Sequence, residues 1–290
     1  MSFRFAAAAA ASIAMVFSAC GQETGDDAVD QPEVTVEAAK ADPENWRAVD
    51  PENLLVFETT KGRILIEVLP QAAPKHAEQF KTIIGGSQFD GTVFHRVIAG
   101  FMAQGGDIFA LNGLGSGLPN IPGEFDFRRS PTDMPLALIG DPATATQGYY
   151  MGFPMQTQPE LLAEMTKDKM VDSWILHCKG MVSTARTDDL NSANSQFFLM
   201  RDTSPHLDRT YTAWGRILDG QSAVDTIKLG EPVENPDILR TARIAADLPE
   251  EQRPSVWVQR TDGPQFQEAL AAQGETPICE LPPVPTVVEG

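Results

Sequence analysis

The chain has 290 residues, which is long enough for one or two domains and for a sizeable buried core. Its 22 Lys and Arg residues against 40 Asp and Glu residues give a formal net charge of −18 at pH 7. This charge repels phosphate backbones and anionic lipid headgroups, so we expect no nucleic acid among the partners. Beyond the N-terminus no apolar run approaches the ~18 residues of a membrane helix, so we expect no internal membrane span.

The N-terminus has the layout of a bacterial secretory signal. Arg4 supplies a positive charge ahead of an apolar stretch over residues 5–17, and small residues follow that stretch. The apolar stretch is too short to span a membrane comfortably. We therefore predict a signal peptide over residues 1–19.

Cys20 stands directly after two small residues, Ser18 and Ala19. This arrangement resembles the lipobox of bacterial lipoproteins, although Phe17 stands where that pattern usually has leucine. The resemblance implies that Cys20 is lipidated and becomes the mature N-terminus. We therefore predict an exported, periplasmic protein that is lipid-anchored to a bacterial envelope membrane and meets the membrane only through this anchor.

Residues 20–50 are acidic and poor in aromatic side chains, and Pro32 and Pro43 interrupt them. A segment of this composition buries too little apolar surface to offset the entropy lost when it becomes ordered. We therefore predict that residues 20–50 form a flexible acidic tether between the N-terminus and a folded domain.

Hydrophobic periodicity predicts several elements after residue 50. Residues 54–68 alternate apolar and polar side chains around a turn at residues 60–62, which predicts a β-hairpin with one buried face. Residues 74–84 begin with proline, carry an apolar stripe and are followed by two glycines, so we predict a helix. A second short helix is predicted over residues 222–229 and a closing strand over residues 239–245.

The most informative stretch is residues 94–107, which read Phe-His-Arg-Val-Ile-Ala-Gly-Phe-Met-Ala-Gln-Gly-Gly-Asp. Its β-branched and aromatic residues favour strands, and Gly100 divides the run into two of them. Alternation along the first strand places Arg96 where its guanidinium can line a concave apolar wall while keeping its charge. The pair Gly105-Gly106 permits unusual backbone angles and so aims Gln104.

By order and spacing this run resembles the signature of the cyclophilin family of peptidyl-prolyl isomerases. Residues 195–199, Ser-Gln-Phe-Phe-Leu, are similar to the family's other central strand. Leu207-Asp208 followed by residues 211–215, Tyr-Thr-Ala-Trp-Gly, is similar to a third segment. Three matches in the family's order over residues 94–215 are hard to obtain by chance.

The resemblance implies a mainly β fold, a closed eight-stranded antiparallel barrel capped by two helices. Periodicity alone would support only a mixed, β-rich domain. We place the cyclophilin-like isomerase domain at residues 51–247 and infer a long insertion at about residues 131–175, because compact members of the family cross this interval with fewer residues. Residues 248–290 form a C-terminal extension, in which we expect residues 250–254 and the proline-rich stretch around Pro282-Pro283 to be loosely folded and residues 264–273 to form a helix.

The role of the insertion stays open at this level. A long structured insertion beside an active face is often functional, so it could extend the substrate groove or bind a partner. A surface embellishment of one lineage is the alternative. Within it, residues 159–170 favour a short helix.

The resemblance also implies an activity and the residues that carry it. When an X-Pro amide is twisted, its nitrogen loses conjugation and becomes a better hydrogen-bond acceptor. The predicted catalytic residues are Arg96 and Gln104. Arg96 is predicted to donate to this nitrogen, and Gln104 is predicted to hold Arg96 and the substrate backbone. The predicted substrate-binding residues are Phe101, Met102, Ala185, Phe198, Leu207 and Tyr211. The implied partners are proline-containing segments of folding proteins, and neither a cofactor nor a metal is implied.

Other interpretations of these residues remain open. The apolar ones could belong to an ordinary core, Arg96 could form a structural ion pair, and the groove could bind proline segments without turnover. Arg186 stands where asparagine is common in the family, and His206 stands where many members have an aromatic residue such as tryptophan. We therefore expect the rim of the pocket to differ from that of other members.

Rival chemistries find little support in the sequence. Cys178 and Cys279 could form a disulfide in an oxidising compartment or remain two unpaired thiols. His177 is a poor activator of Cys178, because neighbours along a strand point to opposite faces. The four histidines have no zinc-ligand spacing, and the glycine-rich loop at residues 112–117 lacks the lysine and helix of a phosphate cradle.

Overall fold

The computed structural model describes residues 34–274 and 276–290. The predicted signal peptide at residues 1–19 and the predicted lipidation site Cys20 lie outside the described residues, so both stay predictions. In the part of the chain that the structure describes, no helix is long and apolar enough to cross a membrane.

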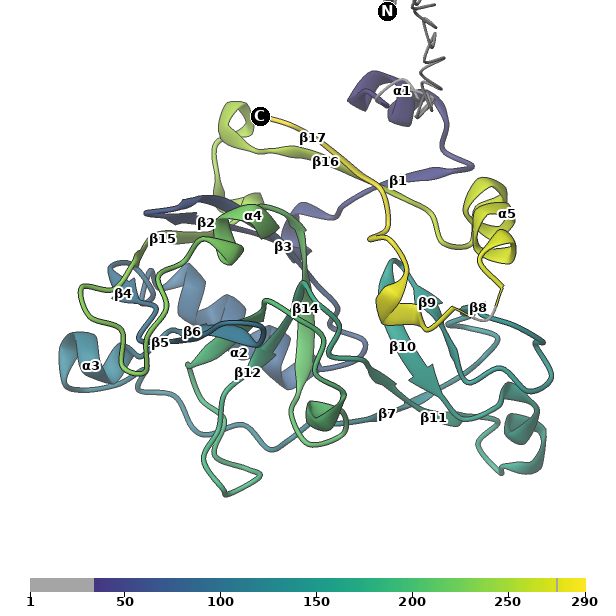
Figure 1. Cartoon of the computed structure of the whole chain (residues 1–290), viewed down its shortest axis with the longest axis horizontal. Coiled ribbons are helices and arrows are strands. Elements are labelled where there is room, and N and C mark those ends of the chain that lie inside the picture. The colour runs from purple at the N-terminus through teal and green to yellow at the C-terminus, as the bar shows by residue number, and fades with distance from the viewer. Residues whose placement is uncertain (1–33, 275) are drawn as a thin grey trace, which may run out of the picture. The chain divides into compact units, whose positions relative to one another are not determined.

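The main body of the fold is a nine-stranded antiparallel sheet that curls into a barrel (Figure 1). Its two outermost strands, β4 and β5, are separated along the chain only by Phe94 and His95, so the two edges of the sheet lie close together. The antiparallel sheet of the predicted eight-stranded barrel is present, and it has nine strands, of which β4 has only two residues. In spatial order the strands are β4 (Thr92–Val93), β15 (Ile238–Ile244), β2 (Leu54–Thr59), β3 (Gly62–Val68), β14 (Ala213–Asp219), β12 (Met181–Thr184), β13 (Phe197–Met200), β6 (Met102–Gly105) and β5 (Arg96–Ile98).

Helix α2 (Pro74–Gly85) fills the barrel interior with its apolar stripe, as its periodicity predicts. Phe80 of α2 stacks on Trp214 of β14, with ring centroids 4.4 Å apart. The second helix, α4 (Gln221–Asp225), is shorter than the predicted 222–229 but buries Ala223 and Val224 as expected. Helix α3 (Ile108–Asn112) follows β6, and 3-10 helices lie at Pro51–Asn53, Glu160–Met165, Pro205–Leu207, Ala245–Asp247, Glu250–Gln252 and Ile278–Glu280.

The N-terminus of α2 is held by the carboxylate of Glu124. This carboxylate accepts hydrogen bonds from the backbone N–H groups of Lys75 and His76, both at 3.1 Å, and lies 2.7 Å from Nδ1 of the buried His76 ring. A helix N-terminus stabilises a negative charge placed there. Burial raises the pKa of Glu124, but the hydrogen bonds from His76 and Lys75 outweigh burial and hold this pKa below its ordinary value.

We predict that Glu124→Gln lowers the free energy of unfolding by about 1–3 kcal/mol at pH 7, because charge-assisted hydrogen bonds to the α2 N-terminus are lost. The folded-state pKa of Glu124 is depressed, so its contribution is present above the unfolded pKa and is lost as pH falls through the folded pKa. Urea unfolding at pH 7, 5 and 3 should therefore show the two proteins converging below about pH 4.5. Glu78→Gln, an exposed change on the same helix, is the control; a pH-independent gap between wild type and Glu124→Gln would contradict the assignment.

The insertion folds into a five-stranded antiparallel sheet of its own (Figure 1). The sheet begins at residue 127, so the predicted start near residue 131 is too late, because β7 pairs with β11 at the far end of the insertion. The predicted helix at residues 159–170 is a 3-10 helix at Glu160–Met165. In spatial order the strands are β7 (Phe127–Arg129), β11 (Val171–Ile175), β10 (Phe153–Thr157), β9 (Gln147–Tyr150) and β8 (Ala137–Leu138).

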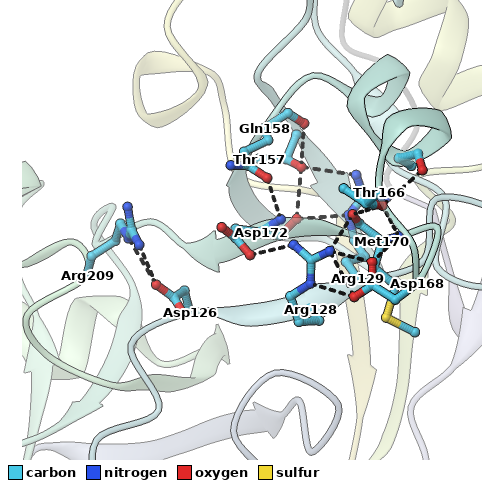
Figure 2. Close-up of polar contacts among 12 residues, drawn as sticks. Asp126, Arg128, Arg129, Thr157, Gln158, Thr166, Asp168, Met170, Asp172 and Arg209 are labelled. Atoms are coloured by element: carbon cyan, nitrogen blue, oxygen red, sulfur yellow. Dashed lines mark hydrogen bonds and ion pairs between the residues drawn. The ribbon is translucent and has the colours of Figure 1, made fainter.

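Two neighbouring arginines of β7 hold this sheet together in different ways (Figure 2). Arg128 is exposed and donates to Asp168 and to Asp172, both at 2.7 Å. Arg129 is buried and donates to Glu160 at 2.8 Å and to neighbouring hydroxyl and carbonyl oxygens. Exposed ion pairs contribute little to stability, whereas a buried guanidinium is strongly destabilising unless its partners are present. The Arg129 contacts therefore fix the connection between β7 and the 3-10 helix.

The predicted flexible tether at residues 20–50 is wrong for its second half. Helix α1 (Val36–Ala41) and strand β1 (Trp46–Ala48) are folded, and β1 forms a three-stranded sheet with β16 (Ser255–Gln259) and β17 (Thr286–Glu289). The extension also carries regular structure within residues 248–274 and 276–290, including α5 (Pro264–Ala272) where a helix was expected. Of the two stretches expected to be loose, the first contains a 3-10 helix at Glu250–Gln252, whereas residues 282–285 form neither helix nor strand. Each segment is too polar to bury a core alone, but side chains such as Trp46 and Val258 are buried once the segments meet.

A buried charge cluster joins strand β1 to the barrel. Arg47 of β1 and Arg216 of β14 both contact the carboxylate of Glu67 on β3, at 2.7 and 2.8 Å. Burial raises the pKa of Glu67, but the charges of Arg216 and Arg47 outweigh burial and hold this pKa below its ordinary value. Glu67 is therefore ionised at neutral pH and links the N-terminal segment to two barrel strands.

Cys178 and Cys279 form a disulfide, with 5.1 Å between their Cα atoms. This finding decides between the two alternatives that the sequence leaves open. It also removes Cys178 as a nucleophile. The bond ties the C-terminal extension to the segment between β11 and β12.

We predict that the double variant Cys178→Ser/Cys279→Ser unfolds with a free energy about 2–4 kcal/mol below that of wild type, because the bond closes a loop with a sequence separation of 101. Urea unfolding with and without dithiothreitol provides the measurement. Reduction should lower the stability of wild type to that of the double variant and leave the variant unchanged. Equal stability of the oxidised wild type and the variant would contradict the prediction.

Candidate active site

A cavity of about 270 Å³ is lined by residues of β5, β6 and β13 together with the segments around residues 185 and 206. All eight residues predicted to act on substrate line it, and Arg186 and His206 complete the wall. The fold thus brings together residues from separate stretches of the sequence. The eight are Arg96, Phe101, Met102, Gln104, Ala185, Phe198, Leu207 and Tyr211.

The register of three adjacent strands sets the centre of this cavity. Arg96 of β5 pairs with Gln104 of β6, and Gln104 pairs with Phe198 of β13. Directly paired residues point to the same face of a sheet. A cation, an amide and an aromatic ring therefore form one cross-strand row. Val97 and Ala103, one position away, are buried in the barrel interior on the opposite face.

Gly106 allows β6 to approach β13 this closely. Its φ of +77° lies in the left-handed region, and a Cβ there would come within 2.7 Å of the carbonyl oxygen of Ser195. Ser195 in turn donates from its hydroxyl to the carbonyl of Gly106 at 3.0 Å. A larger residue at position 106 would push β13 away from Gln104.

Apolar side chains form the floor of the cavity. Met102, Phe198 and Leu207 are each no more than 5% exposed and pack in one core cluster, with the half-buried Phe101 against it. The ring of Tyr211 meets that of Phe198 edge-on, with centroids 5.8 Å apart. These residues therefore belong to the apolar core and also line the cavity. The two interpretations that the sequence leaves open, ordinary core and substrate pocket, thus apply together.

A chain of polar contacts runs along one side of the cavity. Nη1 of Arg96 donates to Oε1 of Gln104 at 3.5 Å, and Nε2 of Gln104 donates to Oε1 of Gln196 at 2.8 Å. Nε of Arg96 also forms an ion pair with Glu231. The ion pair that the sequence leaves open is thus present, yet the Arg96 side chain stays 36% exposed and lines the cavity.

The rim carries a second cation that the sequence singles out as unusual. Arg186 lies over the ring of Tyr211, 4.3 Å from its centroid, and donates from Nε and Nη2 to the carbonyl of Thr210. On the other side, His206 lies 5.8 Å from Phe101, centroid to centroid. The positions that depart from the common family residues therefore both lie at the edge of the cavity.

A second cavity of about 440 Å³ adjoins the first. The two share Gln104, Ala185 and Arg186 as lining residues, and the glycine-rich loop contributes residues 114–117 to the second. Ala185 therefore stands between the two cavities, where a peptide bound in one can continue into the other. The glycine-rich loop, expected only as a turn, forms part of this wall.

The residue behind the floor, His177, was missed as part of the site. Its ring is fully buried and stacks on Phe198, with centroids 6.4 Å apart and planes inclined by 23°. Both its backbone N–H and its Nδ1 contact the carboxylate of Asp208, at 2.8 and 2.9 Å. The sequence signal for this contact is the Leu-Asp pair at residues 207–208. Asp208, which contacts His177, directly follows the cavity residue Leu207.

The insertion also contacts the loop that carries Leu207 and Tyr211. Arg209 forms an ion pair with Asp126 at 2.6 Å, directly before β7 (Figure 2). The same guanidinium lies 4.9 Å from the ring centroid of Trp174 on β11. Strand β11 of the insertion and the residue directly before β7 therefore both contact Arg209, in the loop at the edge of the candidate site.

Among the described residues, no cluster of three or more His, Cys, Asp or Glu side chains could hold a metal ion. The cavity itself offers one amide, two guanidinium groups, an imidazole, a phenol and apolar walls. Such a lining can bind a neutral, partly apolar group and donate hydrogen bonds to it.

Residues 54–246 match the family model described as cyclophilin type peptidyl-prolyl cis-trans isomerase/CLD. The chain belongs to the cyclophilin family. A relative from Brucella abortus (strain 2308), named probable peptidyl-prolyl cis-trans isomerase, is 35% identical over 205 residues, which are 69% of this chain and 86% of the relative. A peptidyl-prolyl cis-trans isomerase of Streptomyces antibioticus is 28% identical over 181 residues, 59% of this chain and 81% of the relative.

The crystal structure of the cyclophilin AquaCyp293 from Hirschia baltica is similar to this fold, with a TM-score of 0.84 and 48% sequence identity. The match covers 88% of this chain and 98% of that chain. Residues 54–246 make up a smaller part of the chain than this match covers. The likeness between the two cyclophilins therefore extends beyond the family domain. The mainly β cyclophilin fold and the membership in a family of isomerase enzymes, both expected from the sequence, are confirmed.

Proposed function

We propose that this cyclophilin accelerates rotation about X-Pro bonds by a non-covalent mechanism in which Arg96 donates a hydrogen bond to the prolyl nitrogen. The observation that carries the proposal is the cross-strand row of Arg96, Gln104 and Phe198 along one cavity. In this row a permanent cation lies beside an apolar floor of the kind that a proline ring requires.

The energy required of such a site is modest. Amide resonance gives X-Pro rotation a barrier of roughly 18–20 kcal/mol, and a thousandfold acceleration needs about 4 kcal/mol of transition-state stabilisation. A hydrogen bond from a charged donor contributes about 1.5–3 kcal/mol, more than a neutral one. One arginine together with a close-fitting apolar floor is therefore sufficient, and no covalent intermediate is needed.

Each lining residue has a distinct role in the proposal. The proline ring packs on the apolar floor of Phe101, Met102, Phe198 and Leu207 and stays still. The residue before proline lies near Ala185, between the two cavities, and its carbonyl rotates. As the amide twists, the lone pair of the prolyl nitrogen is no longer delocalised into the carbonyl and accepts a hydrogen bond from Arg96, so this contact strengthens only in the transition state. Gln104, held by Gln196, keeps Arg96 in place.

We predict that Arg96→Ala lowers kcat/KM at least a hundredfold, equivalent to about 2.7 kcal/mol of transition-state stabilisation, in a protease-coupled assay on an Ala-Pro peptide. Arg240→Ala, an exposed arginine change on β15, should leave the rate unchanged. Equal slow rates for wild type and Arg96→Ala would reject catalysis. That outcome would favour a module that binds proline segments without turnover.

The proposal also covers the compartment in which the protein meets its substrates. We infer that the clients are proline-containing segments of envelope proteins in the periplasm, because Arg4, the apolar stretch and Cys20 have the layout of a lipoprotein signal. The net charge of −18 supports a membrane contact limited to the anchor, since anionic headgroups repel such a surface.

Mass spectrometry of the mature protein, expressed with its N-terminus in a bacterial host, tests the anchor. We expect a chain that begins at Cys20 and carries acyl groups. The variant Cys20→Ser should lack the acyl mass and leave the membrane fraction. A retained N-terminus, or cleavage at another position, would contradict lipidation at Cys20.

A further inference from the structure

The segment that follows α4 runs back along strand β5 and is fixed to it by backbone hydrogen bonds. The N–H of Val97 donates to the carbonyl of Gly230 at 2.8 Å, and the N–H of Gly230 donates to the carbonyl of Val97 at 3.0 Å. Farther on, the N–H of Val233 donates to the carbonyl of His95 at 3.0 Å. Residues 230–233 are therefore held on both sides of Arg96 along the chain.

The tight fold of this segment needs a glycine. A Cβ at position 230 would come within 2.7 Å of the Cα of Val233, so a larger side chain cannot be accommodated without moving the segment. Glu231 follows Gly230 directly, and its carboxylate forms the ion pair with Nε of Arg96. The backbone bridges and this ion pair are separate observations that place Glu231 beside the same guanidinium.

The hydrogen-bonding groups of Arg96 are divided between two partners. A guanidinium has five N–H donors in a fixed planar fork. Nε contacts Glu231, and one donor of Nη1 reaches Gln104 at 3.5 Å, the outer limit for a hydrogen bond. Among the described residues Nη2 has no protein partner. The fork is thus held mainly at Nε, and donors at its far end remain for a ligand in the cavity.

We propose that Glu231 is a positioning residue that orients the Arg96 guanidinium toward the prolyl nitrogen. The inference rests on the proposed role of Arg96 and adds a residue to it. Gln104 alone makes a long contact with a side chain that has many rotamers, so it cannot define the direction of the fork. The carboxylate of Glu231, carried by a backbone segment that is held at Gly230 and Val233, supplies a second point of attachment and leaves Nη2 free.

Kinetics of three variants test this role. Glu231→Ala should lower kcat about tenfold with less than a twofold change in KM, because the loss is felt when the twisted amide accepts its hydrogen bond. Glu231→Gln keeps an acceptor oxygen at the same length and should restore kcat to within about threefold of wild type. Glu234→Ala removes an exposed carboxylate from the same loop and should behave as wild type.

A double-mutant cycle separates positioning from a general effect on the fold. In an Arg96→Ala background, Glu231→Ala should cause no further loss, because its only route to the substrate has been removed. An equal tenfold loss with and without Arg96 would overturn the proposal. So would an equal loss in Glu234→Ala.

A measurement that does not depend on activity keeps the two proposals distinguishable. The Nε–H resonance of Arg96 in proton-nitrogen NMR, assigned from Arg96→Lys, should be shifted and protected from solvent exchange in wild type. It should lose both properties in Glu231→Ala and keep them in Glu234→Ala. An inactive wild type with this NMR pattern would reject the proposed function and uphold the positioning. An Nε–H resonance that is unchanged by Glu231→Ala would overturn the positioning whatever the activity.

Discussion

The register of β5, β6 and β13 is the constraint on which the candidate site depends. Arg96, Gln104 and Phe198 share one cross-strand row, so a slip of one residue in any strand would turn its member toward the barrel interior. The neighbouring residues on these strands, which face the barrel interior, prevent this slip. Val97 and Ala103 are fully apolar and nearly inaccessible within the barrel core, and exposing them would be unfavourable. The same packing that stabilises the barrel therefore aligns the cation with the apolar floor.

The strands around Arg96 and Phe198 could be predicted because the information is local. Alternation and β-branched residues define each strand, and Gly106 marks the place where two of them approach. The pairing of β1 with β16, in contrast, could not be predicted from residues such as Trp46 and Val258. The two strands are separated by most of the chain, and each lies in a polar segment. The ion pair of Arg96 was foreseen as an alternative, but its partner Glu231 could be identified only from the fold.

Buried charges fix the added segments in addition to the apolar cluster that these segments share with the barrel. Glu67 forms ion pairs with Arg47 of the N-terminal segment and with Arg216 of the barrel. Arg129 forms an ion pair with Glu160 inside the insertion. Desolvation of such groups offsets much of their attraction, so they add little net stability. Removal of one partner leaves an uncompensated charge, however, and this makes alternative placements of β1 or β7 unfavourable. We infer that these clusters specify where the additions lie.

The insertion and the C-terminal extension are both connected to residues directly behind the floor of the candidate site. The last strand of the insertion leads directly to His177, whose ring supports Phe198 from behind and whose Nδ1 contacts Asp208. The next residue, Cys178, is bonded to the C-terminal extension. Because Phe198 forms part of the floor, its position depends on a residue held by the insertion on one side and by the disulfide on the other. Through His177 and Cys178, the insertion and the C-terminal extension are thus both connected to the floor of the pocket.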